Sequence, residues 1–450
     1  MSRPVRSILA AALLLLGTGW LSVAQAITIQ PVTSPTGIRA WLVEDHSVPV
    51  VTLRFAFAGG AALDPTGKGG LAAMVSDLLD EGAGPYDTTA FHARLADLGG
   101  YMGFSAGQDE FIGSLRMLTR NLHDTADLLR LALAEPHFAP EAVERIRGDV
   151  LASLAQAAHS PRSIASRMWM HDAFERHPYG SNTDGSETTV AAVTRDDLAQ
   201  FASRRFQRNG LFIGVVGDVT AAAAAALVDQ VFGNLPAGHD AAELPDALPD
   251  DDGALVVSKW PVPQSVVTFG QIGVKRADPD WYAAMVLNDV LGGGNFRGRL
   301  MNEIREKRGL AYGVSTDLVP YRHAGLILGS VATKNSSVGE TIALVRAEWR
   351  RMRDEGPTEA ELDAAKTYLT GSFPLSLDST SHIAAVLVQM QIDGLGIDYL
   401  DRRAGLIEAV TLDQVRALAR RLLDPTRLSF VVVGEPAGVT ATRPPRPMQH

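Results

Sequence analysis

The chain has 450 residues, of which 46% are apolar and 20% charged, so it has the composition of a folded globular protein and not of a disordered one. Its formal net charge is −10 and it contains no basic block, which argues against nucleic acid or an anionic membrane surface as a partner. The length predicts about two to four domains, and the absence of cysteine excludes a disulfide framework and a lipid-anchored start.

The first 26 residues are typical of a secretory signal peptide. Arg3 and Arg6 precede the apolar run ILAAALLLLG, and Ala24 and Ala26 form a small-x-small cleavage signal. We expect cleavage after Ala26, which removes two arginines and changes the formal charge from −10 to −12. The apolar run is short for a membrane span, so no stable membrane insertion is expected after cleavage, and a retained anchor is the alternative.

Short strands open the chain after residue 26, and the mostly apolar segment Val50 to Ala58 is typical of a strand buried on both faces. Helical periodicity follows from Gly69 to Leu79 and again around Phe91. The further elements expected are a strand pair at 101–118, helices at 121–135 and 139–158, a polar turn-rich loop at 177–187, a helix at 195–205, a strand at 211–219 and an alanine-rich helix at 220–232.

The order of elements recurs after residue 253, which indicates an internal repeat. Residues 193–219 match residues 410–436 without a gap, and AAMV occurs at 72–75 and again at 283–286. Residues 236–253, rich in Pro and Asp, are predicted to link two α+β units. Strands in runs joined by short turns predict mainly antiparallel sheets with helices packed on one face. The expected domains are 27–235 and 254–440, followed by a tail at 441–450.

Residues 291–315 predict a glycine loop, a helix and the start of a strand. Loop glycines supply positive φ or close backbone approach, basic residues suit the last turn of a helix, and a glycine after that turn is a common cap. The residues concerned are Gly292, Gly293 and Gly294 in the loop, Leu300, Met301 and Ile304 as the apolar stripe, Lys307 and Arg308 in the last turn, and Gly309 as the cap.

Arg305 and Tyr312 stand on either side of this helix-to-strand corner, where a guanidinium and a phenol are placed to converge on one ligand. Purely structural interpretations compete with that one. Arg305 then complements the helix C-terminus or pairs with Glu303 or another surface acid, and Tyr312 is a half-buried strand aromatic.

The order of these motifs resembles the M16 peptidase family, the inverted zinc-site peptidases related to pitrilysin and to the mitochondrial processing peptidase. The motifs are a helix with GG-x-A at 69–72, HPYG at 177–180, VT-x-x-D-L at 193–198, VVGD at 215–218, GGG at 292–294, REKRGLAY at 305–312 and VVVGE at 431–435. The resemblance covers essentially all of the chain after the signal segment. It implies an α+β fold of two sandwich halves that form one arm of a clamshell around peptides, and the smaller bacterial members work as dimers of such arms.

Active members of that family carry H-x-x-E-H, in which two histidines bind zinc and the glutamate activates the metal-bound water, with a third ligand, a glutamate, downstream. The corresponding positions here hold Ala73, Ser76 and Asp77, and Ser153 replaces the downstream glutamate. Alanine and serine supply neither a zinc ligand nor a base, and one carboxylate does not hold zinc in water. No metal is therefore expected in this chain, and its histidines contain no pair at i, i+4 that would form a replacement site.

The sequence bears on two further kinds of chemistry, cation binding and serine hydrolysis. Asp77, Asp80 and Glu81 form either a weak oxygen site for a hard cation or a solvated acidic helix end. His92 is predicted to be a helix-surface or half-buried histidine and not a ligand. The sequence has no G-x-S-x-G, so serine hydrolysis is not expected.

The resemblance implies a role for Arg305 and Tyr312, because M16 enzymes use an arginine and a tyrosine at this spacing to hold substrate and stabilise the tetrahedral intermediate. The first hypothesis is a non-catalytic subunit of a periplasmic heterodimer, which supplies this pair to a peptide-cleaving partner that carries H-x-x-E-H and zinc. The second is a stand-alone peptide-binding or scaffold protein, and the third is a metal-independent or unusually liganded peptidase. An adjacent exported chain with an intact motif favours the first.

Overall fold

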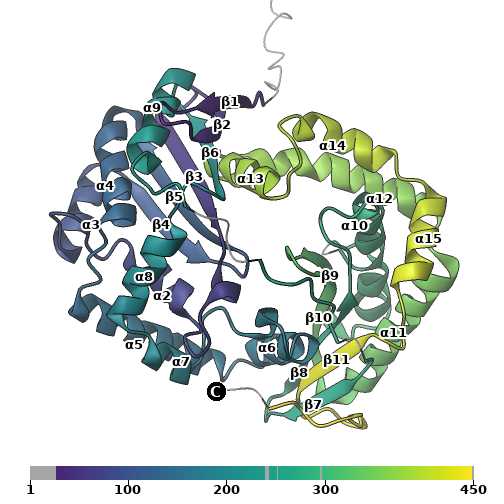
Figure 1. The fold of residues 1–450 in the computed structure, drawn as a ribbon. Helices are drawn as coiled ribbons and strands as arrows, with labels where there is room; N and C mark the ends of the chain where they lie inside the picture. Colours follow the sequence, from purple (N-terminus) through teal and green to yellow (C-terminus); the bar gives the residue numbers. More distant parts are fainter. Residues whose placement is uncertain (1–26, 239–242, 251, 294–295, 448–450) are drawn as a thin grey trace, which may run out of the picture.

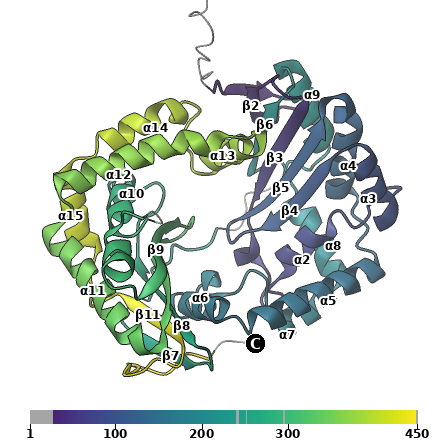
Figure 2. The same cartoon turned by 180° about the vertical axis from the view of Figure 1, so that it is seen from behind.

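The computed structural model describes residues 27–238, 243–250, 252–293 and 296–447. The expected signal peptide, residues 1–26, lies outside the described residues. Each half of the chain forms one β-sheet covered by helices, and the two halves stand beside each other (Figures 1 and 2). No helix in the described ranges is long and apolar enough to cross a membrane.

The N-terminal half contains a six-stranded sheet in the order β1-β2-β6-β3-β5-β4. Its strands are β1 (Gln30–Thr33), β2 (Arg39–Glu44), β3 (Val50–Ala58), β4 (Tyr101–Ala106), β5 (Glu110–Leu118) and β6 (Leu211–Gly217). Its helices are η1 (Ala61–Leu63), α2 (Leu71–Leu78), α3 (Thr88–Asp97), η2 (Thr119–Asn121), α4 (Leu122–Ala134), α5 (Pro140–Ala157), α6 (Pro161–Ala173), η3 (Pro178–Gly180), α7 (Glu187–Ala192), α8 (Arg195–Arg205) and α9 (Ala221–Phe232).

The C-terminal half contains a five-stranded sheet in the order β7-β11-β8-β10-β9. Its strands are β7 (Leu255–Lys259), β8 (Gln264–Ile272), β9 (Ala311–Pro320), β10 (Gly325–Lys334) and β11 (Ser429–Gly434). Its helices are α10 (Trp281–Leu291), η4 (Met301–Glu306), η5 (Asn335–Ser337), α11 (Val338–Glu355), α12 (Glu359–Ser372), η6 (Phe373–Leu377), α13 (Thr380–Ile392), α14 (Tyr399–Glu408) and α15 (Leu412–Leu422).

The two sheets have the same strand order once the edge strand β1 is set aside. β2-β6-β3-β5-β4 corresponds to β7-β11-β8-β10-β9, and only the β2/β6 and β7/β11 pairs are parallel. The repeated sequence forms the same units, because Thr194 and Thr411 both open a helix, α8 and α15, with a capping box. The predicted α+β fold of two mainly antiparallel halves is confirmed.

β3 shows why the N-terminal sheet is stable. Val51, Leu53, Phe55 and Phe57 alternate along the strand and are buried in the helix-covered core. Thr52 on the opposite face is also buried. The prediction of a strand buried on both faces is therefore confirmed, and each such apolar side chain contributes about 1.5–3 kcal/mol relative to an exposed one.

The two halves exchange one helix, which sequence analysis did not predict. α6 packs on β8 and β11 of the C-terminal sheet, where Trp169 joins a core with Val256 and Val433. α13 packs in return on β3 and β6, where Leu387 joins Val216 (Figures 1 and 2). Helices of the same half cover one face of each sheet, as expected, and a helix from the other half covers part of the second face. The halves are thus held together by apolar packing in both directions.

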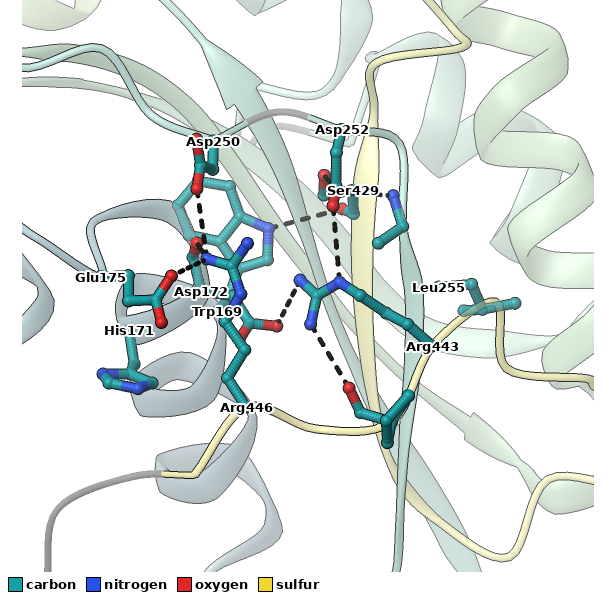
Figure 3. Close-up of polar contacts among 12 residues, drawn as sticks. Trp169, His171, Asp172, Glu175, Asp250, Asp252, Leu255, Ser429, Arg443 and Arg446 are labelled. Carbon is teal, nitrogen blue, oxygen red and sulfur yellow. Dashed lines mark hydrogen bonds and ion pairs between the residues drawn. The ribbon is translucent and has the colours of Figure 1, made fainter.

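The end of the chain fastens this exchanged helix. Arg443 pairs with Asp172 of α6 at 3.0 Å and with Asp252 at 3.4 Å, and Arg446 pairs with Asp250 at 3.2 Å (Figure 3). The backbone N–H of Thr442 donates to Leu255 in β7 over 2.8 Å. The predicted tail is therefore structured as far as residue 447. It ties α6 and the segment before β7 to the C-terminal sheet. Residues 448–450 lie outside the described part of the chain.

Candidate functional site

The glycine loop after α10 is shaped by close packing and not by positive φ. Gly292 has a φ of −170°, and neither it nor Gly293 is left-handed. A Cβ atom on Gly293 would lie 2.7 Å from the Asp289 Cα, and one on Gly292 would lie 2.8 Å from the Thr316 Oγ1. The expectation of close approach is confirmed for both glycines, and the alternative of positive φ is wrong for both. Gly294 lies outside the described residues.

The helix that follows is a short π-helical segment, η4, with its apolar residues buried as predicted. Gly309 ends it with a φ of 62°, the left-handed region that favours glycine. Its N–H donates to the Arg305 carbonyl, and the Leu310 N–H donates to the Ile304 carbonyl, each over 2.9 Å. The glycine cap predicted at this position is confirmed, and it turns the chain directly into β9.

The basic residues of the last turn act at the helix end, as expected for Arg308, which donates to the Glu303 carbonyl over 2.9 Å, and they also pair with a side chain. Lys307 and Arg308 both pair with the nearly buried Glu303, at 2.5 and 2.6 Å. Hydrogen bonds from Lys307 and then from Arg308 hold the pKa of the Glu303 carboxyl below its usual value. Glu303 is thus already satisfied, so the interpretation in which it pairs with Arg305 is wrong. The alternative in which Arg305 pairs with another surface acid is confirmed, because its guanidinium lies 3.5 Å from Glu306.

Arg305 and Tyr312 both reach solvent at this corner. The Arg305 guanidinium lies 3.5 Å from Glu306 and 4.7 Å from the ring centre of Phe296, and its side chain is 35% exposed. Tyr312 is 90% exposed, so its interpretation as a half-buried strand aromatic is wrong. η4 and β9 contact each other, which places the two residues on adjoining elements. Both polar ends are available to a ligand.

The base of the same corner is fixed by buried polar contacts that the sequence did not indicate. Arg299, only 6% exposed, donates two hydrogen bonds of 2.7 Å to Glu361 and one of 2.9 Å to the Gly356 carbonyl. Burial raises the pKa of Glu361, but the bonds from Arg299 and Thr358 outweigh it and bring the pKa to about 2. These bonds tie the segment directly before η4 to α12 and to the turn before α12.

The helix in the family's zinc-binding position, α2, is closed by internal hydrogen bonds. Asp64 accepts from the N–H groups of Gly70 at 3.0 Å and Ala72 at 3.2 Å, which caps its start, although burial raises the Asp64 pKa to about 7. Ser76 is buried, and its hydroxyl donates to the Ala73 carbonyl over 2.7 Å. Neither Ala73 nor Ser76 presents a free ligand atom.

The other two positions, Asp77 and Ser153, have exposed side chains that end in oxygen atoms. Asp77 reaches solvent on α2. Its pKa is raised first by the protein atoms that displace part of its hydration and then by the charges of Asp184 and Asp80. Ser153 is exposed on α5, and α5 packs against α2. The helices that carry the four positions are thus brought together, but their side chains provide one carboxylate and no imidazole.

A cluster beside α2 corrects one expectation. The side chains of Asp80, Glu81 and His92 each bring a possible ligand atom within 4.8 Å of the others, and the His92 imidazole lies 3.7 Å from Asp80. Glu81 is buried, so the interpretation as a solvated acidic helix end is wrong for Glu81, whereas Asp77 is exposed. His92 is exposed on α3, as predicted for a helix-surface histidine. Arg145 of α5 pairs with Glu81 and lies 3.8 Å from Asp149. Its guanidinium supplies the positive charge that a cation would otherwise bring.

Comparison with known proteins places these features in a family. A model described as insulinase (peptidase family M16) matches residues 39–187, and a model described as peptidase M16 inactive domain matches residues 192–369. A "non-peptidase homolog YmxG" of Helicobacter pylori is 26% identical over 421 residues, which cover 93% of this chain and 97% of that protein. An uncharacterized zinc protease of Mycobacterium leprae is 29% identical over 321 residues, covering 71% and 72%.

Solved structures agree with this placement. A peptidase M16 inactive domain from Pseudomonas fluorescens superposes with a TM-score of 0.85 at 29% identity, covering 93% of this chain and all of that one. A protease from Helicobacter pylori superposes with a TM-score of 0.81 at 18% identity, covering 90% of this chain and 99% of that one, a similarity that concerns the fold alone. The relatives thus include proteins named as peptidases and a protein named as a non-peptidase.

Proposed function

The chain belongs to the M16 peptidase family, and we propose that it is the non-catalytic subunit of a periplasmic, heterodimeric zinc peptidase. In this proposal it supplies Arg305 and Tyr312 to a catalytic partner that carries H-x-x-E-H and binds the zinc. The chain itself needs no cofactor. The name of its Helicobacter pylori relative, a non-peptidase homolog, is consistent with an arm that lacks its own catalytic site.

One contrast carries the proposal. The N-terminal half has no set of zinc ligands at Ala73, Asp77 and Ser153, whereas the C-terminal half presents Tyr312 at 90% exposure beside an Arg305 that is 35% exposed. The exposed Tyr312 phenol and the surface ion pair of Arg305 with Glu306 add little to the stability of the isolated chain. Their presence is explained if they act on a ligand held between this arm and another.

The chemistry of the two groups fits peptide cleavage in a partner's site. A phenol O–H and a guanidinium donate hydrogen bonds that strengthen as a peptide carbonyl oxygen becomes an oxyanion. Arg305 also offers a planar fork for the substrate carbonyl before the reaction begins. The packing of Phe296 beside the Arg305 guanidinium, at 4.7 Å, restricts where the fork points.

The test is assembly followed by metal analysis. Co-expression with an exported M16 chain that has an intact motif should give a stable one-to-one complex by light scattering, with zinc in the partner only. The Tyr312→Phe variant is the matched control, because it removes one exposed oxygen and should assemble equally well. A chain that stays monomeric beside that partner would support a stand-alone peptide-binding scaffold instead, and one tightly bound zinc per isolated chain would contradict the proposal.

A further inference from the structure

The HPYG segment at 177–180 holds a tyrosine that the proposed function does not use. Tyr179 is fully buried, and its ring packs 4.7 Å from the ring of Tyr321 and 5.7 Å from that of Phe174, measured between centres. Tyr321 begins the turn between β9 and β10, so the two rings meet across the boundary between the halves. A fully buried phenol at such a boundary requires a hydrogen-bond partner.

The Tyr179 hydroxyl connects three segments that are far apart in sequence. It donates to the Asp109 Oδ1 over 2.6 Å and accepts from the His323 backbone N–H over 3.1 Å. The second carboxylate oxygen of Asp109 accepts from the Arg322 N–H over 3.0 Å. One phenol and one carboxylate therefore join the β4–β5 turn, the segment η3 and the β9–β10 turn.

The charges around the pair favour this arrangement. Burial, followed by the hydrogen bond to Asp109, raises the pKa of Tyr179, so the phenol keeps its proton and acts as the donor. Burial and then the charge of Asp109 raise the pKa of neighbouring Glu110 to about 7, which limits the negative charge at the turn. The carboxylate of Asp109 thus remains the acceptor to which both halves donate.

We propose that Tyr179 and Asp109 form a joint that sets the position of the β9–β10 hairpin relative to the N-terminal half. β9 carries Tyr312 at its opposite end, and β4, on the other side of the joint, packs against α2. The joint therefore aligns the strand of Tyr312 with the face of the N-terminal half that includes α2. Tyr179 and Asp109 are positioning residues, and only their consequence for Tyr312 rests on the proposed function.

The Tyr179 ring belongs to the core that α6 forms with the C-terminal sheet, so only its hydroxyl can be removed without disturbing that packing. The exchanged helices α6 and α13 bury apolar residues in both directions and do not depend on the Tyr179 hydroxyl. Replacing Tyr179 by phenylalanine keeps the ring contacts and removes one oxygen. It leaves the Asp109 Oδ1 and the His323 N–H without their partner, so the hairpin should loosen while the fold persists.

Hydrogen exchange on the isolated chain tests the joint directly, because the amides of Arg322 and His323 donate into it. Tyr179→Phe should speed exchange of the His323 amide about tenfold or more, with the amides of α6 and α13 unchanged. Asp109→Asn should speed exchange at Arg322, since an amide oxygen cannot replace both carboxylate acceptors.

Tyr321→Phe is the matched control. Its ring packs on Tyr179, but among the described residues its hydroxyl makes no hydrogen bond, so exchange at Arg322 and His323 should stay as in the wild type. Unchanged exchange at both amides in Tyr179→Phe and Asp109→Asn would overturn the joint. A uniform increase across α6 and α13 would overturn it as well, because it would show general destabilisation.

The absence of cysteine allows a second readout. Spin labels on cysteines introduced at the exposed positions Gln200 and Arg350 report the distance between the halves. Tyr179→Phe should broaden the measured distance distribution, whereas Tyr321→Phe should not. Identical distributions for the wild type and Tyr179→Phe would contradict the joint without affecting the proposed role of Tyr312, which is measured separately by turnover of the complex.

Discussion

The first α-helix of each half, α2 and α10, carries the same AAMV sequence, yet one polar residue beyond each helix is placed differently. After α2, Glu81 is buried and paired with Arg145. After α10, Tyr312 is 90% exposed. The same helix sequence therefore precedes two different surroundings, because Glu81 is paired inside the N-terminal half and Tyr312 of the C-terminal half faces solvent.

The comparison also explains how an exposed site stays ordered. Directly before η4, Arg299 is buried against Glu361, and in β9 the Thr316 N–H donates to the Gly292 carbonyl over 2.7 Å. Charged and backbone hydrogen bonds therefore fix the segments before and after η4 in the chain.

Arg299→Ala should have the largest effect on stability. It leaves Glu361 and the Gly356 carbonyl without their donor, and we expect a loss of about 2–3 kcal/mol in the free energy of unfolding, reduced from a fully buried pair because Glu361 is partly exposed. Urea unfolding at pH 7 measures it. The Glu361 pKa is lowered to about 2, so the contribution is present above the unfolded carboxyl pKa and is lost as the pH falls through about 2.

Two controls accompany that measurement. Arg204→Ala removes an exposed arginine from α8 and should change stability by less than about 0.5 kcal/mol. Arg299→Lys keeps the charge without the planar fork, so its loss of stability should lie between the losses caused by Arg204→Ala and Arg299→Ala. Equal stability of Arg299→Ala and the wild type would show that the corner does not depend on its buried base.

Tyr312→Phe should have the next largest effect, on catalysis and not on folding. Loss of one donor to the oxyanion lowers kcat of the assembled complex by about 10²-fold, whereas Tyr101→Phe, which alters another exposed strand tyrosine, should leave it unchanged. Arg305→Ala should in addition raise KM, because the guanidinium holds substrate in the ground state. Arg305→Lys should rescue only in part.

The double variant of Arg305 and Tyr312 tests whether the two groups serve one oxygen. Its loss should be smaller than the product of the single losses, as expected for residues that act together. Strictly multiplicative losses would assign the two residues to separate parts of the substrate.

Asp77→Asn should have a smaller effect on stability, and its size depends on pH. Partial burial and the neighbouring aspartates raise the Asp77 pKa in the folded chain, so its protonated form is favoured there. Stability is therefore lost as the pH rises through the folded pKa, and the asparagine variant should gain less than about 1 kcal/mol at pH 8 and nothing at pH 3. Thermal unfolding of the wild type and the variant at pH 8 and pH 3 measures the difference in stability. An asparagine variant less stable than the wild type at pH 8 would show that the surroundings of Asp77 do not raise its pKa.

Restoring the family motif on α2 should have the smallest effect. Ala73→His, Ser76→Glu and Asp77→His together should still bind no stoichiometric zinc while Ser153 remains, as metal analysis after gel filtration would show. Adding Ser153→Glu completes the ligand set and should raise zinc affinity at least about tenfold. Tight zinc binding by the triple variant would mean that the α2 face is closer to a working site than its internal contacts indicate.

Much of the fold was predictable because its signals are local. Capping residues such as Thr194 and Thr411, the cap at Gly309 and the alternating apolar residues of β3 act within a few positions of the chain. The 27-residue repeat then indicated two halves with a common order of elements.

The features that the sequence did not predict depend on contacts between residues far apart in the chain. The packing of α6 on the C-terminal sheet joins residues about 260 positions apart, as in the 3.4 Å hydrogen bond from Trp169 to the Ser429 carbonyl, and no periodicity within α6 indicates which sheet it covers. The contact of Asp80 with His92 likewise depends on how α3 packs. For the candidate site, the spacing of Arg305 and Tyr312 was visible in the sequence, but the buried Arg299 beneath them and the exposure of Tyr312 were not.

The central claim is that this chain contributes catalytic groups to another subunit, and a titration tests it most directly. Peptide cleavage by the catalytic partner is measured as this chain is added, with Tyr312→Phe in parallel. The account predicts a rise to a plateau at one-to-one stoichiometry, and a plateau about 10²-fold lower for the variant. Full turnover by the partner alone, or plateaus for the two chains within about twofold of each other, would contradict it.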